Sequence, residues 1–314
     1  MIRTPAALLI AGALTALAGC GSDDPTTAGD EGPTIVATTS IWADVAGNVA
    51  CDGLAEVVTI IPPGGDPHAF EASLRDRETM ESASLIVANG LGLEEGLSDM
   101  IDSVESNGVP VVRVGDTIDT LAAGEDDRDA DSDDDHDAGT EDPHIWFDPV
   151  RVTDTLPAIA DGLAEAGLDR AALDSCVSIY SDALTSLDDD IRTLLAPLPV
   201  ERRLLVTNHD SLSYFADRYD FEVLGSVIPS PSSLAGTNPG DLEELADLID
   251  ETGVPAIFAE TEHSSSDTEA LADRVGNVEV VTLQTATLGE RGSATGTYVT
   301  WLTTTAQTIA EALS

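Results

Sequence analysis

The chain has 314 residues, of which 59 are Asp or Glu and 13 are basic, so its formal net charge is −46. All 13 basic residues are arginine, and the acids are spread along the whole chain. This composition excludes nucleic acid as a partner, because nucleic-acid binding requires a basic patch. It also predicts a halophilic acidic surface, since concentrated salt shortens the Debye length to about 3 Å and screens the repulsion.

The first 33 residues predict an export signal followed by a tether. A basic start leads into an apolar run over residues 6–18, which is too short to span a bilayer. Small residues then precede Cys20, which resembles the bacterial lipoprotein signal, in which this cysteine is lipidated and becomes the first residue. An ordinary signal peptide with an incidental cysteine is the alternative. We expect a signal peptide over 1–19, a lipid-anchored tether over 20–33, and an extracytoplasmic location at the cell membrane.

Short apolar, β-branched runs alternate with helical patterns in the next part of the chain. This alternation predicts parallel strands with helices on both faces of a sheet. We predict strands over 34–38, 56–61, 84–88 and 109–114, and helices over 40–49, over 71–82 and up to about residue 106.

A long helical pattern with few breakers follows over 151–195. It exceeds a usual helix, so it is either one long helix or two helices with a break near Gly167. Strand and helix then alternate again. The predicted strands are 203–207, 221–224, 256–259 and 278–283, and the predicted helices are 210–219, 241–251, 265–275 and 298–313.

These patterns predict an α/β protein with two lobes. Each lobe, 34–148 and 198–314, is expected to be a mostly parallel sheet flanked by helices. The helical segment over 149–197 is expected to link them.

The most biased segment of the chain, 125–142, holds eleven acids and His136. Because such a run repels itself and cannot bury a core, we expect a mobile, solvated loop. It leads into His144, which lies between prolines and is followed by two aromatic residues that can pack its ring in place. A flexible anionic loop beside a rigid histidine indicates cation capture.

Three of the five histidines fall in strand-end or hinge positions. His68 follows the second strand of lobe one, His209 follows the first strand of lobe two, and His144 ends lobe one. Ligands of open α/β sheets bind beyond the carboxyl ends of the strands, and three imidazoles suit Zn²⁺. A single strand-end histidine is more often a turn residue, so the metal hypothesis depends on the set of three.

The other two histidines are weaker candidates. His136 lies in the acidic loop and is predicted to be a transient metal contact or to have no role. His263 follows a strand and can approach the cleft. Asp66 and Asp210 each lie near a predicted ligand, where they can accept the second ring N–H or cap a helix.

Two cysteines remain once Cys20 is assigned to the lipoprotein signal. Cys51 and Cys176 are predicted to form a disulfide in an oxidising compartment. Two separate buried thiols are the alternative, because spacing alone does not bring the two residues together.

Five motifs stand out along the chain: IPPGGDPHAFE at 61–71, DPHIWFDP at 142–149, TNHD at 207–210 with Tyr214-Phe215, IFAE at 257–260 and GTY at 296–298. Together they resemble the substrate-binding lipoproteins of zinc and manganese ABC transporters, a family of periplasmic zinc-binding proteins. The resemblance implies two lobes joined by one long rigid helix, a metal between the lobes, limited closure on binding, and delivery to a membrane permease.

By this resemblance His68, His144 and His209 are the first three metal ligands. Manganese members tend to carry a carboxylate at the third position, so His209 favours zinc over manganese. The position of the fourth ligand is occupied here by Gln284, and a neutral amide is a poor zinc ligand. The fourth donor is therefore expected to be Glu260 or water, with Gln284 as a weak ligand at most.

The predicted function is a non-enzymatic, monomeric receptor that captures Zn²⁺ for an ABC importer. A zinc-dependent hydrolase is one alternative, although neither HExxH nor GxSxG occurs in the chain. A manganese-binding or adhesin-type member of the same family is the other.

Overall fold

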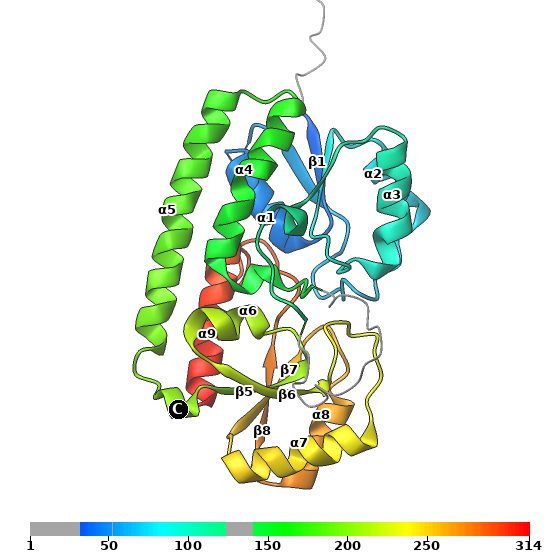
Figure 1. Ribbon diagram of the computed structural model, residues 1–314. Coiled ribbons are helices and arrows are strands. Elements are labelled where there is room, and N and C mark those ends of the chain that lie inside the picture. The colour runs from blue at the N-terminus through cyan, green and yellow to red at the C-terminus, as the bar shows by residue number, and fades with distance from the viewer. Residues whose placement is uncertain (1–31, 52, 124–140) are drawn as a thin grey trace, which may run out of the picture. The chain divides into compact units, whose positions relative to one another are not determined.

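The computed structural model describes residues 32–51, 53–123 and 141–314, and these form two α/β lobes (Figure 1). The predicted signal peptide, Cys20, and nearly all of the tether and the acidic loop with His136 lie outside the described residues. No helix in the described part of the chain combines the length and apolar character needed to cross a membrane.

Lobe one contains a four-stranded parallel sheet in the order β2-β1-β3-β4. The central strands are almost wholly buried because helices cover both faces. Side chains alternate between the faces, so Ile35 packs with α1 and α4 while Val36 packs with α2 and α3. The elements are β1 (Thr34–Ala37), α1 (Ser40–Val49), β2 (Glu56–Thr59), α2 (Leu74–Glu81), β3 (Leu85–Ala88), α3 (Ser98–Ser106) and β4 (Val111–Arg113).

Lobe two repeats this topology, with a parallel sheet in the order β6-β5-β7-β8. In Figure 1, α7 and α8 lie beside this sheet at the end of the molecule distant from lobe one. Its elements are β5 (Leu204–His209), α6 (Ser213–Tyr219), β6 (Glu222–Ile228), α7 (Pro239–Thr252), β7 (Ala256–Glu260), α8 (Ser266–Val275), β8 (Glu279–Leu283) and α9 (Tyr298–Ala312).

The helical segment between the lobes consists of two helices, α4 (Pro149–Glu165) and α5 (Arg170–Leu195). The break falls at Gly167, whose φ of +103° is readily accessible only to glycine. Its N–H bonds to the Ala164 carbonyl and that of Leu168 to the Leu163 carbonyl, which is a Schellman ending. Of the two arrangements open from the sequence, the structure has the broken one.

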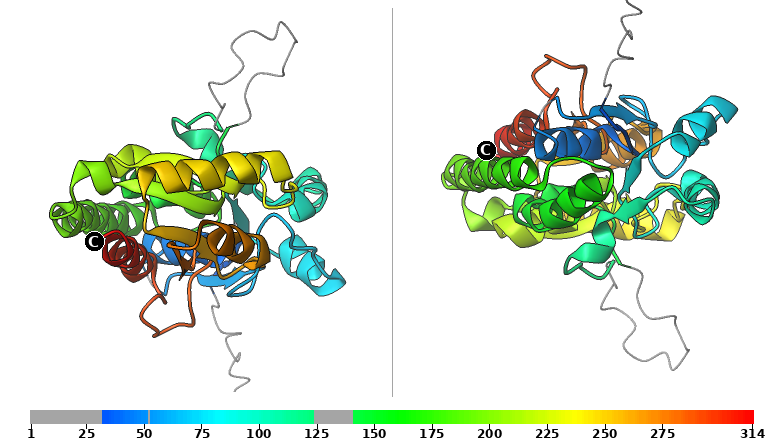
Figure 2. Two further views of the ribbon diagram at one scale, coloured as in Figure 1. Left: turned by 90° about the horizontal axis from the view of Figure 1, so that it is seen from below. Right: turned by 90° about the horizontal axis from the view of Figure 1, so that it is seen from above.

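The two helices of the segment 149–197 pack against different parts of the fold. Helix α4 packs on β3 and β4 and so belongs to lobe one, whereas α5 contacts both α1 and α9. Figure 1 and the two views in Figure 2 show α5 running beside α9 along one side of the fold. The rigid connection is therefore α5, with α9 packed against it.

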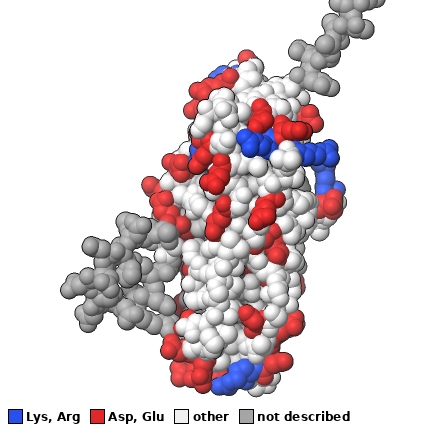
Figure 3. All heavy atoms as spheres, turned by 90° about the vertical axis from the view of Figure 1, so that its right-hand side faces the viewer, with Lys and Arg blue, Asp and Glu red and all other residues white. Residues whose placement is uncertain are grey.

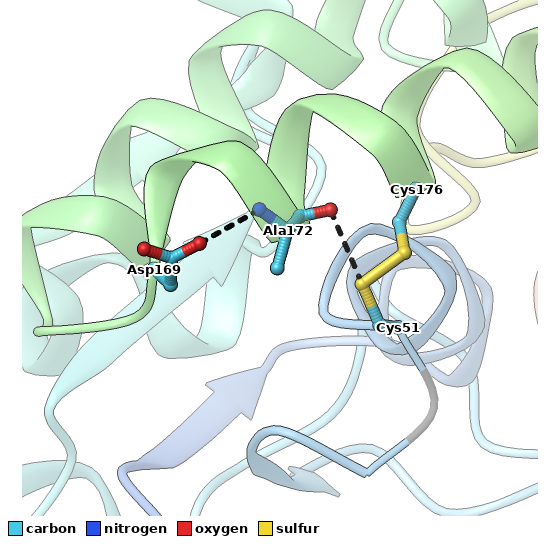
Figure 4. Close-up of a disulfide and its surroundings, with 4 residues drawn as sticks. All are labelled: Cys51, Asp169, Ala172 and Cys176. Atoms are coloured by element: carbon cyan, nitrogen blue, oxygen red, sulfur yellow. Dashed lines mark hydrogen bonds between the residues drawn. A yellow bond between two sulfur atoms is a disulfide. The ribbon is translucent and has the colours of Figure 1, made fainter.

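A disulfide joins Cys51, just after α1, to Cys176 in α5, as predicted (Figure 4). The two Cα atoms lie 5.5 Å apart although 125 positions separate them in the sequence. The bond ties lobe one to the connecting helix. Figure 4 also shows Cys51 Sγ close to the Ala172 carbonyl, one turn before Cys176.

Candidate metal-binding site

The three predicted histidines meet at one point between the lobes. Nε2 of His144 lies 3.4 Å from Nε2 of His68 and 3.2 Å from Nε2 of His209. A tetrahedral zinc ion with nitrogen ligands at 2.0–2.1 Å would place those nitrogens roughly 3.3 Å apart. All three rings are at most 3% exposed. Both of these separations match the spacing of ligands around a single ion, and one ligand atom from each of the three rings lies within 4.8 Å of the other two.

Each histidine is delivered by a different part of the fold. His209 is the last residue of the central strand β5, and His68 lies in the loop after β2. His144 comes immediately before the short 3-10 helix Ile145–Phe147, which leads into α4. The carboxyl ends of the two sheets thus face one cleft, as open α/β sheets require of a ligand site.

Two of the three rings have a buried carboxylate at the nitrogen opposite the convergence point. Asp142 Oδ1 accepts a hydrogen bond from His144 Nδ1 at 2.8 Å, and Glu260 Oε1 lies 2.9 Å from His209 Nδ1. A carboxylate at Nδ1 holds the proton there and leaves the Nε2 lone pair free for a metal. The sequence indicated neither contact with Nδ1.

The third ring has a more distant carboxylate. Glu95 Oε1 lies 3.5 Å from His68 Nδ1, and Glu95 itself is 40% exposed. Burial, together with the neighbouring rings of His144 and His209, lowers the pKa of His68 to about 2. His68 is therefore a neutral imidazole at physiological pH, the protonation state that a metal ligand needs.

Each lobe contributes a hydrogen bond to the loop that carries His144. The Asn89 amide of lobe one donates to the Pro143 carbonyl at 2.9 Å. From lobe two, the Tyr214 hydroxyl donates to the Asp142 carbonyl at 2.8 Å. Neither residue was a candidate site residue from the sequence, although Tyr214 belongs to one of the motifs that carry the family resemblance.

The remaining predicted residues lie in two different places. Glu260 and His263 form a second group of possible ligands with His209. Gln284 lies immediately after the last residue of β8. Its amide donates to the Thr287 carbonyl at 2.6 Å and accepts from the Thr295 hydroxyl at 3.1 Å, so it is bound to the loop after β8.

Glu260 contacts three side chains at the site, those of His209, Ser211 and His263. Besides its contact with His209, its Oε1 accepts from the Ser211 hydroxyl at 2.9 Å. Burial opposes ionisation of Glu260, but His209 and His263 outweigh it and hold its pKa well below the usual range. The carboxylate is therefore ionised, as a metal ligand or the orienting partner of one must be.

Two sheets of one topology, joined by α5 and enclosing a buried three-histidine centre, define the class of protein as a two-lobed metal-binding protein. Residues 35–312 match the family described as zinc-uptake complex component A, periplasmic. The chain belongs to this family.

Several relatives are similar over nearly the whole chain. The zinc-binding protein TroA of Treponema pallidum is 33% identical over 320 residues, covering 99% of this chain and 98% of that protein. The manganese-binding lipoprotein MntA of Halalkalibacterium halodurans is 31% identical over 299 residues, covering 95% and 94%. The solved structure of periplasmic TroA from T. pallidum superposes with a TM-score of 0.80 at 30% identity, covering 90% of this chain and 99% of the other.

Proposed function

We propose that this protein is the extracytoplasmic receptor of an ABC importer, which captures Zn²⁺ between its lobes and delivers it to a membrane permease. The observation that carries the proposal is the convergence of three buried Nε2 atoms at 3.2 and 3.4 Å. Both lobes contribute to this set, so an ion bound there links them. Release to a partner then requires the lobes to move, which is what a delivery protein needs.

We assign His68, His144 and His209 as the ligands of the ion. The contact of Glu260 with Nδ1 of His209 supports an orienting role for Glu260. In this arrangement a water completes a four-coordinate shell. Rotation of Glu260 into the shell is the alternative, and Gln284 is less suited because its amide is bound elsewhere.

Zinc is the cargo that the donor set supports best. Three neutral imidazoles suit Zn²⁺, whereas Mn²⁺ favours carboxylate and carbonyl oxygen. Manganese is the second candidate, because relatives named as manganese-binding and one named as zinc-binding are about equally similar to this chain.

The buried site supports binding rather than hydrolysis. A catalytic zinc needs an open coordination position that a substrate reaches, and the three rings are at most 3% exposed. Glu260 is the candidate general base, but its carboxylate already contacts the His209 ring and accepts a hydrogen bond from the Ser211 hydroxyl. We infer a monomeric receptor anchored through a lipid on Cys20, in line with relatives named as lipoproteins.

Metal identity and ligands are tested together on crystals grown with equal amounts of Zn²⁺ and Mn²⁺. Anomalous scattering at the two absorption edges should show zinc alone, on His68, His144 and His209. Manganese at this position would contradict the choice of cargo. Turnover of peptide or ester substrates by the zinc-loaded protein would contradict the assignment as a receptor.

Replacing a ligand should affect binding far more than replacing a histidine of the acidic loop. We expect His144→Ala to weaken zinc affinity by more than about 100-fold, above what loss of an outer-shell partner costs. His136→Ala is the matched control and should stay close to wild type. Competition with a zinc chelator measures both, and equal effects would overturn the ligand assignment.

A further inference from the structure

The chain contains two Asp-Pro-His motifs, and their aspartates behave differently. In both, an aspartate oxygen accepts from the backbone N–H of the histidine at 2.9 Å. Asp142 also binds the ring of its own histidine, His144. Asp66 does not bind His68 in this way. Its Oδ2 instead accepts from the Ser233 hydroxyl of lobe two at 2.8 Å.

The same Asp66 oxygen faces a fourth histidine. His263 Nδ1 lies 3.5 Å from Asp66 Oδ2, across the boundary between the lobes. A carboxylate thus stands at the Nδ1 of His263, as it does at the rings of the three proposed ligands. When Asp66 holds the proton on Nδ1, the lone pair of His263 Nε2 is free to bind a metal.

A second potential ligand atom lies close to that nitrogen. His263 Nε2 lies 3.2 Å from Glu260 Oε2, close to the roughly 3.3 Å between two ligand atoms of one tetrahedral ion. Glu260 Oε2 is fully buried, and apart from the His263 ring nitrogen it has no hydrogen-bonding group beside it within the described part of the chain. A buried carboxylate oxygen without a hydrogen bond is costly unless a cation compensates it.

We propose that His263 Nε2 and Glu260 Oε2 form an outer divalent-cation site, which holds the incoming ion before it passes to the three histidines. The inference rests on the proposed function. The side chain of His263 is 13% exposed, against 3% for His209, and the two rings lie 5.3 Å apart. The outer site therefore lies between solvent and the inner one.

Glu260 connects the two sites. Its Oε1 contacts Nδ1 of His209, an inner ligand, while its Oε2 faces His263. An ion that leaves the outer pair therefore moves past a ring that the same carboxylate holds. Two protein donors with water in the remaining positions bind weakly, which suits a site that must release its ion inward.

The simpler explanation is that a protonated His263 neutralises Glu260 without any ion. The two explanations differ in the number of cations that the protein binds. The test uses the mature chain, freed of metal and kept in molar NaCl, which screens non-specific binding to the acidic surface. Cadmium-113 NMR counts the bound ions, and stopped-flow measurements give the rate of zinc capture.

We expect wild type to bind one cadmium ion tightly and a second more weakly. His263→Gln should lose the weaker ion and capture zinc more slowly, while affinity for the tight ion changes by less than about tenfold. His144→Ala, the matched control, should lose the tight ion and keep the weaker one.

Three results would count against the proposal in distinguishable ways. A wild-type protein with a single cadmium signal and the same capture rate as His263→Gln overturns the outer site and leaves the receptor function standing. Loss of the tight ion in His263→Gln, to the extent seen in His144→Ala, also overturns it, because His263 then belongs to the inner site. A wild-type protein that binds no ion refutes the receptor function itself.

A measurement on the wild type does not depend on how the variants fold. Diethyl pyrocarbonate modifies accessible imidazoles, and peptide mass spectrometry locates the modified residues. Cadmium should protect His263 only at concentrations that fill the weaker site. Protection of His263 by the first, tight ion alone, or no protection at all, would contradict the outer site.

Discussion

At the scale of single residues, the site depends on carboxylates that fix imidazole orientation. Asp142 illustrates this most fully, because its Oδ1 accepts from both the backbone N–H and the ring Nδ1 of His144. The side chain is 1% exposed, so little water competes for these contacts. One aspartate therefore sets the loop conformation and the ring tautomer together.

Replacing this aspartate should weaken metal binding without removing a ligand. We expect Asp142→Asn to lower zinc affinity by about 10- to 100-fold, since the amide cannot hold the Nδ1 proton as a carboxylate does. Asp154→Asn on the exposed face of α4 makes the same charge change and should leave affinity unaltered. Chelator competition compares the two variants, and equal affinities would contradict the orienting role of Asp142.

A second residue-scale feature holds α5 against α6. The Asp188 carboxylate accepts hydrogen bonds from Arg218 Nε at 2.9 Å and from Arg192 Nε at 3.2 Å. Burial alone would raise the pKa of Asp188, but the two guanidinium groups outweigh burial and lower it. Because its pKa is lower in the folded than in the unfolded protein, Asp188 stabilises the fold above the unfolded value near 4.

This contribution should be lost as the pH falls through the lowered pKa of the folded state. At neutral pH we expect Asp188→Asn to reduce the free energy of unfolding by about 1–2 kcal/mol, because both arginines remain partly solvated. The difference from wild type should shrink below about pH 4. Asp189→Asn, exposed on the same helix, is the control in urea titrations. A difference that does not change with pH would contradict the ion-pair explanation.

At the scale of elements, α5 carries the connection between the lobes. It packs on α1 and α9, and the disulfide fastens it to the end of α1. The ion pair between Asp188 of α5 and Arg218 of α6 joins it to lobe two. Helix α5 is thus attached on both sides of the cleft, which favours small lobe movements over large ones.

Removing the disulfide should destabilise the fold because the bond closes a loop of 125 positions. Chain entropy alone predicts a loss of about 5 kcal/mol in the free energy of unfolding for the Cys51→Ala/Cys176→Ala double variant. Urea unfolding measures this loss, and the reduced wild type should resemble the double variant. An unchanged midpoint would show that packing alone holds α1 to α5.

At the scale of the whole molecule, the large negative net charge is the main influence on stability. The sequence carries 59 acids against 13 arginines, and Figure 3 shows acidic side chains across the face it presents, with basic ones in only a few places. Net charge of this size destabilises a compact state through self-repulsion, which salt screens.

The melting temperature should therefore rise as NaCl is increased from low to molar concentration. Differential scanning calorimetry of the metal-free protein makes the measurement, with no added divalent ions so that binding does not contribute. Sucrose at matched water activity is a control for solvent exclusion. A flat or falling melting temperature would refute the halophilic interpretation of the surface.

Much of the fold follows from local sequence. Buried strands such as Leu85–Ala88 are continuous apolar runs, and a helix such as α2 begins where Ser73 and Asp76 form a capping box. The positions of His209 at the end of β5 and of His68 in the loop after β2 follow from the same strand signals. The sequence left one long helix or two as alternatives, because a single Gly167 does not by itself decide between continuation and a break.

What the sequence determined by itself is therefore the two α/β lobes, the charge of the surface and the three histidines, because periodicity, composition and strand ends are local properties of the chain. Only the tertiary structure decided the rest: the 3.2 and 3.4 Å approach of the Nε2 atoms, the carboxylate at each ring, and the Cys51–Cys176 bond. Except for Asp142 and His144, which are two positions apart, these contacts join residues tens to more than one hundred positions apart, so they depend on how the lobes and α5 pack together. The same packing turns Asp66 away from its own histidine and towards His263.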